Sequence, residues 1–380
     1  MSEQKMLRVA IVGCGKIADD HARTILCIPN CKIVGLCDRE PLMASQLGQR
    51  FGISACFSNL QEMLRATAPN VVHITTPPQN HFALAKQCLE EGCHVYVEKP
   101  FTLYSSEAEE LIALAGGHGL KLTVGHGEQF SHVARRMRGL IRGGFLGGRP
   151  VHMESTWCYE LGDSSYVRAL LSNETHWVRG LPGGLLQNLI SHGLAKVVEF
   201  LSTETPKVIA VGFASSALSG FDAQKFVDEL LVVITEEEGT TAYFTFSSQI
   251  RPVLHQFCIY GPNGGLLLNE DQQTLIKLRA EKYKSYLEMF VGPLVFAMQY
   301  IYNCAKNVRL FLARDFHMES GMKYLIEAFY RSITDGAPIP IPYNQILLTS
   351  RLMDAIFEQV RSSDHSAQPL AALPGLASVK

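Results

Sequence analysis

The sequence lacks several features that would direct it out of the cytoplasm or toward a charged partner. Only 18% of its 380 residues are charged and the formal net charge is −2, which argues against nucleic acid or another polyanion as a partner. Residues 1–5 contain no apolar core of a signal peptide. The ten cysteines include no CxxC pair, which predicts reduced thiols and no metal site. Together these absences predict a cytoplasmic protein.

The first third of the chain alternates short apolar runs with helical patterns. Strands are expected at 7–12, 32–37, 71–75, 93–97 and 121–124, and helices at 16–28, 41–50, 59–67, 80–91 and 104–117. The strand-like runs are apolar enough to be buried on both faces, as in a parallel sheet covered by helices. The pattern predicts an α/β fold whose first part, residues 1–125, is a doubly wound parallel-sheet (Rossmann) domain.

The pattern changes after residue 125, where strand-like runs follow one another through short turns. Strands are expected at 150–158, 206–214, 226–235, 240–248 and 255–260, with helices at 131–143 and 184–202. Such runs favour an open, mainly antiparallel sheet with helices on one face, in an α+β substrate and oligomerisation domain over 126–362. An open sheet needs cover, so a homodimer or homotetramer is expected. Residues 363–380 are predicted to form a flexible tail.

A glycine turn follows the first predicted strand. Gly13 would permit the tight turn, and Gly15 would let the backbone approach a pyrophosphate. Lys16 and Ile17 would then begin a helix whose free N–H groups and dipole favour that anion. The order of strand, glycine turn and helix predicts a dinucleotide-binding site.

An acidic residue closes the second predicted strand. Asp38 lies about 20 residues beyond the glycine turn, where a carboxylate can accept both ribose hydroxyls and repel a 2′-phosphate. Arg39 could stack on adenine or tolerate such a phosphate. Because the carboxylate opposes the phosphate, the spacing predicts NAD as the cofactor in preference to NADP.

A polar loop follows the third predicted strand, and loops at this end of a parallel sheet line the ligand crevice. Thr75, Thr76, Pro77 and His81 are therefore candidates for contacts to the cofactor. The alternative is a turn that starts a helix, with His81 as its local cap.

Glu98 and Lys99 come at the end of the next predicted strand, which points to the same crevice. Both are candidate cofactor contacts. A lysine beside nicotinamide could also hydrogen-bond a substrate hydroxyl and stabilise the negative charge that develops on its oxygen. The alternative for Lys99 is a solvated strand end.

A helix beginning near Gly183–Gly184 carries Asn188 and His192, which are four residues apart and therefore share a face. The residues alone leave His192 open as a structural, hydrogen-bonded histidine or as a site residue.

Taken together, these motifs resemble the glucose–fructose oxidoreductase, inositol dehydrogenase and MocA family (Gfo/Idh/MocA) over residues 7–360. The resemblance is carried by Gly13, Gly15 and Ala18, by Thr76, Pro77 and His81, by Glu98, Lys99 and Pro100, and by Gly183, Gly184 and His192. It implies NAD-dependent hydride transfer between nicotinamide and a secondary alcohol or ketone of a sugar, sugar nucleotide or cyclitol. Lys99 and His192 then inherit the catalytic roles, with Asn188 positioning the imidazole.

The chain departs from the family pattern in two places. Asn188 stands where many members have aspartate, and an amide supplies no charge to the imidazole. Gly127 and Glu128 replace the asparagine and arginine that are usual after the fifth strand, and His126 becomes a candidate contact to the nicotinamide. These departures leave two alternatives open: an NAD-binding sensor or regulator without turnover, and a lyase or hydrolase that uses NAD transiently.

Polar and aromatic residues gather over 157–180, ahead of the histidine helix. Such side chains stack on sugar rings or bind phosphates and carboxylates, and they also occur at subunit contacts. The candidates are Trp157, Tyr159, Tyr166, Arg168, His176, Trp177 and Arg179.

Residues 285–305 carry a single charged side chain, Glu288, with lysines and arginines on both flanks. Gly292–Pro293 interrupts this apolar run. Three roles are open for it: cover for the protein's own sheet or a subunit contact, peripheral contact with a membrane surface, and a membrane-spanning helix.

Overall fold

The computed structural model describes residues 6–160, 176–215, 227–279, 284–316 and 320–363. The predicted tail lies outside these residues except at its first position. The candidate substrate contacts Tyr166 and Arg168 also lie outside the described residues.

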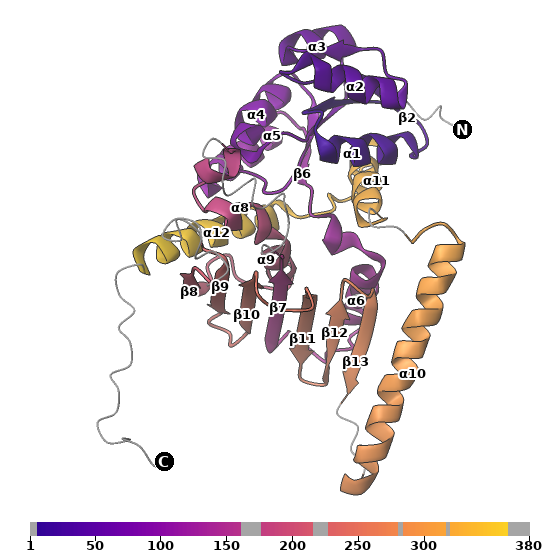
Figure 1. Cartoon of the computed structure of the whole chain (residues 1–380), viewed down its shortest axis with the longest axis vertical. Helices are drawn as coiled ribbons and strands as arrows, with labels where there is room; N and C mark the ends of the chain where they lie inside the picture. Colours follow the sequence, from indigo (N-terminus) through magenta and orange to yellow (C-terminus); the bar gives the residue numbers. More distant parts are fainter. Residues whose placement is uncertain (1–5, 161–175, 216–226, 280–283, 317–319, 364–380) are drawn as a thin grey trace.

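Six parallel strands form the first sheet, in the order β3-β2-β1-β4-β5-β6. They are β1 (Leu7–Val12), β2 (Cys31–Cys37), β3 (Cys56–Phe57), β4 (Val71–Ile74), β5 (His94–Val97) and β6 (Leu122–Val124). They alternate with α1 (Lys16–Leu26), α2 (Pro41–Phe51), α3 (Leu60–Thr67), α4 (His81–Glu90) and α5 (Ser105–Gly117), which surround the sheet in Figure 1. Val9, Ala10 and Ile11 in β1 are fully buried, as continuous apolar runs predict for a parallel sheet. The predicted doubly wound fold is confirmed.

The strand order reverses between β1 and β4, which lie side by side at the centre of this sheet. Ligands of doubly wound folds bind in the crevice outside the carboxyl ends of the strands at such a reversal. The glycine turn follows β1, and the loop from Thr75 follows β4. The topology therefore brings these two predicted cofactor segments together.

A helix from the far end of the chain completes the first core. In α11 (Ser320–Thr334), Leu325, Ile326 and Phe329 are fully buried within the same cluster as the parallel strands. Figure 1 shows α11 next to α1, and residues of the two helices are in contact. The packing of the first domain thus depends on residues about 200 positions after its last strand.

The second sheet has seven strands in the order β13-β12-β11-β7-β10-β9-β8. They are β7 (His152–Cys158), β8 (Lys207–Phe213), β9 (Glu229–Thr235), β10 (Thr241–Ser247), β11 (His255–Gly261), β12 (Gly264–Asn269) and β13 (Thr274–Arg279). Strands β7 and β10 pair in parallel, and the other neighbours are antiparallel. The predicted mainly antiparallel sheet is confirmed, although β12 and β13 extend it beyond the predicted strands.

Helices pack on one face of the second sheet. They are α6 (His132–Arg142), α8 (Gly184–Leu189), α9 (Ser191–Val198) and α12 (Tyr343–Ser363), and Figure 1 shows them on the side toward the first sheet. Along β10, Phe244 and Phe246 are fully buried while Tyr243 is exposed, the alternation expected of a sheet with one covered face. The single helix predicted over 184–202 was wrong: α8 and α9 are separate, with Ile190 between them, and α9 ends at Val198.

The apolar segment around residue 290 forms α10 (Ser285–Leu312), which lies along β13 at the edge of the second sheet (Figure 1). Within the described part of the chain, none of the helices has the combination of length and apolarity required to span a bilayer.

Candidate active site

The glycine turn joins β1 to α1. Gly13 has a φ of +92°, and a Cβ there would lie 2.7 Å from Thr76 Cγ2, so this position requires glycine. A Cβ on Gly15 would meet nothing within 4 Å, so the backbone faces open space. Lys16 and Ile17 follow, exposed and half-buried. Among the described residues no side chain caps α1, which leaves its first N–H groups available to an anion.

Asp38 ties the end of β2 to this turn. Its carboxylate accepts hydrogen bonds from Cys14 N at 2.7 Å and from Glu40 N at 2.9 Å. The side chain is only partly buried and Arg39 beside it is exposed, so the carboxylate keeps lone pairs for ribose hydroxyls. Together with the glycine turn, this arrangement fits a dinucleotide.

The loop after β4 contacts the glycine turn through Thr75. Thr75 Oγ1 donates a hydrogen bond to Gly13 O at 2.6 Å, and it is buried. Thr76 Oγ1 is buried with no hydrogen-bond partner among the described residues, and Pro77 is exposed. Thr76 and Pro77 thus border the crevice, whereas Thr75 holds the turn.

His81 lies inside the protein instead of in the crevice. Its two ring nitrogens are 2.8 Å from Pro100 O and 2.9 Å from Thr76 O, and the residue is fully buried. Burial lowers the pKa of the imidazole, and a neutral ring can donate to only one of these carbonyls. His81 therefore holds two loops together, and its contact with the cofactor stays a prediction.

The side chain of Glu98 also points inward, and its contact with the cofactor stays a prediction. The residue is 6% exposed. Its carboxylate lies 3.0 Å from His21 Nε2 and accepts a hydrogen bond from Lys99 N at 3.2 Å. Burial would raise the pKa of Glu98, but His21 and Lys99 hold that pKa below its usual value. Glycine at position 125 leaves room for the Glu98 carboxylate, since a Cβ there would lie 2.4 Å from Glu98 Oε1.

Lys99 follows β5 and reaches toward the second sheet. Its Nζ donates to the Asn188 backbone O at 3.2 Å and lies 3.5 Å from Asn188 Oδ1. Asn188 in α8 therefore holds Lys99, whereas the four-residue spacing predicted that it would orient His192. The break between α8 and α9 changes which neighbours the side chain meets.

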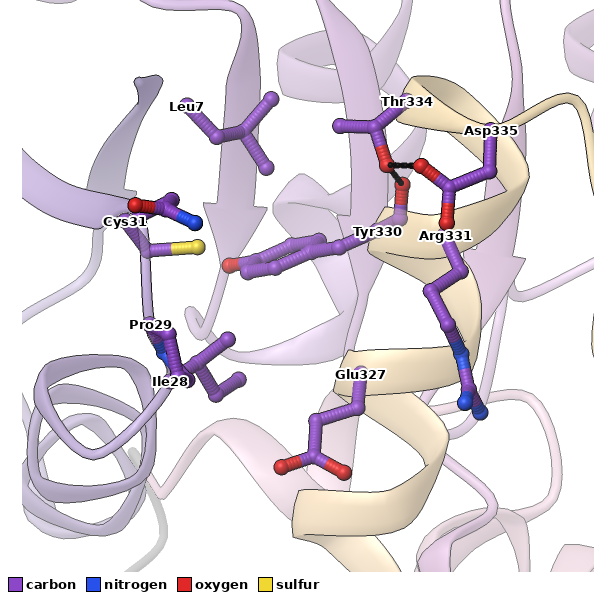
Figure 2. A pocket seen from close by; sticks show the side chains of 10 residues that line it. Leu7, Ile28, Pro29, Cys31, Glu327, Tyr330, Arg331, Thr334 and Asp335 are labelled. Carbon is purple, nitrogen blue, oxygen red and sulfur yellow. Dashed lines mark hydrogen bonds between the residues drawn. The ribbon is translucent and has the colours of Figure 1, made fainter. Parts of the chain in front are cut away.

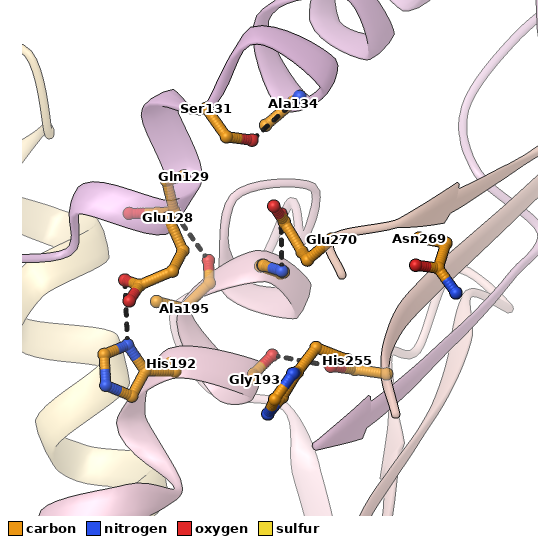
Figure 3. A network of polar contacts seen from close by, with 12 residues as sticks. Glu128, Gln129, Ser131, Ala134, His192, Gly193, Ala195, His255, Asn269 and Glu270 are labelled. Atoms are coloured by element: carbon orange, nitrogen blue, oxygen red, sulfur yellow. Dashed lines mark hydrogen bonds and ion pairs between the residues drawn. The ribbon is translucent and has the colours of Figure 1, made fainter. Parts of the chain in front are cut away.

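A carboxylate from another segment contacts the histidine. Glu128 lies in the short 3-10 turn η2 (Gly127–Phe130), and its Oε2 is 2.9 Å from His192 Nδ1 (Figure 3). Burial would raise the pKa of Glu128, but the charge and the hydrogen bond of His192 hold that pKa below its usual value. On the opposite side the ring stacks on Trp157, with centroids 4.8 Å apart and planes at 14°. His192 thus has a carboxylate partner that the sequence analysis did not assign.

Close packing fixes the position of η2. Gln129 Nε2 donates to Ala195 O in α9 at 2.9 Å (Figure 3). A Cβ on Gly127 would lie 3.2 Å from Met322 N in α11, and a Cβ on Gly321 would lie 2.2 Å from Gly127 O. A side chain at position 127 would therefore require Met322 to shift by a few tenths of an ångström. The departures at 127 and 128 therefore belong to one local arrangement.

His126 follows β6 by two residues and lies close to His192. The residue is 4% exposed, its ring centroid is 6.5 Å from that of His192, and its Nε2 has no hydrogen-bond partner among the described residues. Burial, followed by the charge of His192, lowers the pKa of His126 to about 3. A neutral imidazole with an unpartnered nitrogen fits a polar contact with a bound ligand.

Five of the seven candidate substrate contacts lie within the described residues. Trp157 is buried against His192, as described above. His176 Nδ1 accepts a hydrogen bond from Val178 N at 3.3 Å, and Trp177 O accepts one from Gln79 at 2.6 Å. Tyr159 is exposed and Arg179 is half-buried. The backbone contact of Trp177 places this segment beside the loop after β4.

A separate cavity of about 260 Å³ lies at the amino ends of β1 and β2, opposite the crevice. Figure 2 shows it between the start of β1, the loop before β2 and Tyr330 of α11. Ligand crevices lie at the carboxyl ends of the strands, so this cavity is not the cofactor site. A buried chain of contacts runs from this cavity to Glu98 at the carboxyl end of β5. Tyr330 Oη is 2.8 Å from His73 Nε2, and His73 Nδ1 is 2.8 Å from His21 Nδ1. The other ring nitrogen of His21 contacts Glu98.

A model of an oxidoreductase family with an NAD-binding Rossmann fold matches residues 7–126. This is the Gfo/Idh/MocA family, and the match spans the first sheet of the chain. The match covers the glycine turn, Asp38 and Lys99, and it ends at His126. The first domain of this chain is therefore an NAD-binding Rossmann domain.

Several dehydrogenases are similar to parts of this chain. D-Glucoside 3-dehydrogenase of Escherichia coli (strain K12) is 32% identical over 142 residues, which are 37% of this chain and 40% of that protein. UDP-N-acetylglucosamine 3-dehydrogenase of Acidithiobacillus ferrooxidans is 30% identical over 149 residues, 39% of this chain and 44% of that protein. This chain thus spans less than half the length of either relative.

A solved structure extends the likeness to the second sheet. The WlbA dehydrogenase from Bordetella pertussis, in complex with NADH and UDP-GlcNAcA, has a TM-score of 0.74 at 15% identity. The likeness covers 94% of this chain and 96% of that one. At this identity it shows a shared fold.

Proposed function

We propose that this protein is an NAD-dependent oxidoreductase that transfers a hydride between nicotinamide and a secondary alcohol or ketone of a sugar, sugar nucleotide or cyclitol. Residues 1–125 bind the cofactor, and 126–362 form the substrate and oligomerisation domain. The proposal is carried by the contact of Lys99 with Asn188 and the pairing of His192 with Glu128, a carboxylate whose pKa the charge of Lys99 also lowers. The sugar-directed dehydrogenases among the relatives support the substrate class.

The roles of the side chains follow from their partners. Bound NAD supplies the hydride acceptor. Since His192 Nδ1 faces Glu128, that nitrogen carries the hydrogen and Nε2 is left to take the proton of the substrate hydroxyl. Lys99 donates a hydrogen bond to the same oxygen and stabilises its developing negative charge. Asn188 positions Lys99, and Glu128 stabilises the imidazolium that forms.

Turnover is tested with the purified protein, NAD and a panel of sugars, nucleotide sugars and polyols, by the absorbance of reduced cofactor. We expect NADH to form with at least one secondary alcohol of the panel. Tight NAD binding without turnover of any compound would instead indicate a sensor. Product formed without net NADH would indicate transient use of the cofactor, as in a lyase or hydrolase.

Asp38 is proposed to select NAD. The Asp38→Ala variant is expected to lose about tenfold or more in NAD affinity, since a hydrogen bond to a charged group contributes about 1.5–3 kcal/mol. NADP affinity should change less, because the variant also removes a charge that repels its phosphate. Titration calorimetry with both cofactors measures the ratio, with Asp20→Ala as the control for losing an acid nearby. An unchanged ratio would refute the assignment.

The open face of the second sheet is proposed as the contact of a homodimer or homotetramer. Large apolar side chains are exposed there, including Ile209, Phe213, Leu231 and Tyr243, each 49–64% exposed. Apolar side chains gathered on one face commonly mark a subunit contact. We expect Ile209→Asp to lower the mass measured by sedimentation equilibrium to that of a monomer, and an unchanged mass would place the contact elsewhere.

A further inference from the structure

In the second half of α10, the side chains that contact the protein are polar. Gln299, Asn303 and Asn307 are spaced four residues apart and therefore lie in one row along the helix. Gln299 accepts a hydrogen bond from Lys277 N at 2.7 Å and donates to Lys277 O at 3.1 Å. Asn303, which is fully buried, accepts from Leu275 N at 3.2 Å and donates to Leu275 O at 3.0 Å.

This row of amides satisfies the open edge of β13. An edge strand presents unpaired N–H and C=O groups, which proteins must cover to avoid pairing with other chains. Asn307 continues the row by donating to Gln272 O at 2.9 Å. The helix therefore uses its polar residues to attach to the sheet, which reverses the usual orientation of an amphipathic helix.

The outward side of α10 is consequently apolar. Leu287, Phe290, Leu294, Ile301, Val308 and Phe311 recur at intervals of three, four or seven residues and are 40–73% exposed. The apolar arc is wide, since Tyr300 and Leu312 are also 48% and 75% exposed. Monomeric proteins rarely expose apolar side chains in a continuous patch of this kind.

Positive charge surrounds the apolar arc. Over residues 284–314 the basic side chains are Lys284, Lys306, Arg309 and Arg314, and the acidic one is Glu288. A groove of about 790 Å³ between α10 and β13 is lined by the basic residues Arg136, Lys277 and Arg279 and by the acidic Glu288. The basic side chains match an anionic surface layer, and the exposed apolar side chains match an apolar layer beneath it.

We propose that α10 lies in the interface of a bilayer containing anionic phospholipid and holds the protein at the membrane surface. Its apolar arc enters the boundary between headgroups and acyl chains, and the basic residues contact lipid phosphates. A helix pair between two copies of the chain is less well matched. In a helix pair, charged side chains beside the apolar contacts usually select the partner helix. In α10 these positions hold Val291, Met298 and Ala305, which carry no charge.

The test is flotation of the full-length protein with phosphatidylcholine vesicles that contain or lack phosphatidylglycerol. We expect the protein to float with the anionic vesicles, and salt to weaken binding. Leu294→Asp should reduce binding by about tenfold or more, because burial of one leucine contributes about 1.5–3 kcal/mol. Lys306→Gln and Arg309→Gln should each reduce it about fivefold. Leu42→Asp is the matched control, since Leu42 in α2 and Leu294 are 61% and 59% exposed.

Two outcomes would overturn the proposal. One is the absence of flotation with anionic vesicles, and the other is equal flotation of wild type and Leu294→Asp. If Leu294→Asp instead lowers the oligomeric mass of a protein that does not float, the helix is a subunit contact. Unfolding temperatures of the variants establish that each is folded. NADH formation is a separate readout, so failure here leaves the catalytic proposal standing.

Discussion

Replacing Lys99 with methionine is expected to lower kcat by about 10²- to 10⁴-fold, the range for a positioned proton-transfer or charge-stabilising group. Methionine retains much of the unbranched stem but removes the donor that faces Asn188. The charge on the reacting oxygen develops in the transition state, so the loss should fall on kcat more than on KM. NAD affinity should change little, because the proposed site of the pyrophosphate is the glycine turn, on another loop.

Steady-state kinetics and NAD titration calorimetry measure the two quantities separately. Lys86→Met is the matched control, since Lys86 is an exposed lysine of the same domain whose Nζ pairs with Glu110 at 2.7 Å. Asn188→Ala removes the amide oxygen near Nζ but leaves the backbone carbonyl, so we expect a smaller loss of kcat. Equal losses of kcat and NAD affinity in Lys99→Met would make the lysine a cofactor-binding group and not a catalytic one.

The part of the site that could be predicted from sequence is the part built by one local pattern. Continuous apolar runs predicted strands buried on both faces, and the parallel sheet then brings strand ends to one crevice. The glycine turn, Asp38 and Lys99 each follow directly from a strand. The topology of the sheet therefore brings these three segments to the same end of the strands.

The direction of a side chain at a strand end could not be predicted in this way. Glu98 and Lys99 are adjacent, yet the first turns toward buried His21 and the second toward Asn188. His81 similarly faces two backbone carbonyls. Each outcome depends on which buried partner satisfies the polar group, because an unpaired buried group costs about 1–3 kcal/mol.

Contacts between distant segments escaped the sequence analysis for a related reason. Glu128 and His192 are 64 positions apart and meet because η2 packs against both α9 and α11. The available signal was the simultaneous loss of an acid at Asn188 and gain of one at Glu128. The carboxylate expected four residues before the histidine is supplied from another segment.

Glu128→Gln is expected to lower kcat by up to about 10⁴-fold, the size of effect found when a histidine loses its orienting carboxylate. The amide keeps the shape of the side chain but no longer favours the protonated imidazole. We therefore expect the acid limb of the pH profile of kcat/KM to move toward lower pH. Glu128→Asp should restore part of the activity, because it keeps the charge.

A stability measurement separates this role from a purely structural one. Because folding lowers the pKa of Glu128, its ionised form stabilises the fold above the ordinary glutamate range, and this contribution is lost as pH falls. The difference in unfolding temperature between wild type and Glu128→Gln should shrink on acidification. Glu199→Gln is the control, since Glu199 is an acid directly after α9 that pairs with Arg138 and lies away from the imidazole. If Glu128→Gln and Glu199→Gln share the wild-type pH profile, His192 acts without its carboxylate partner.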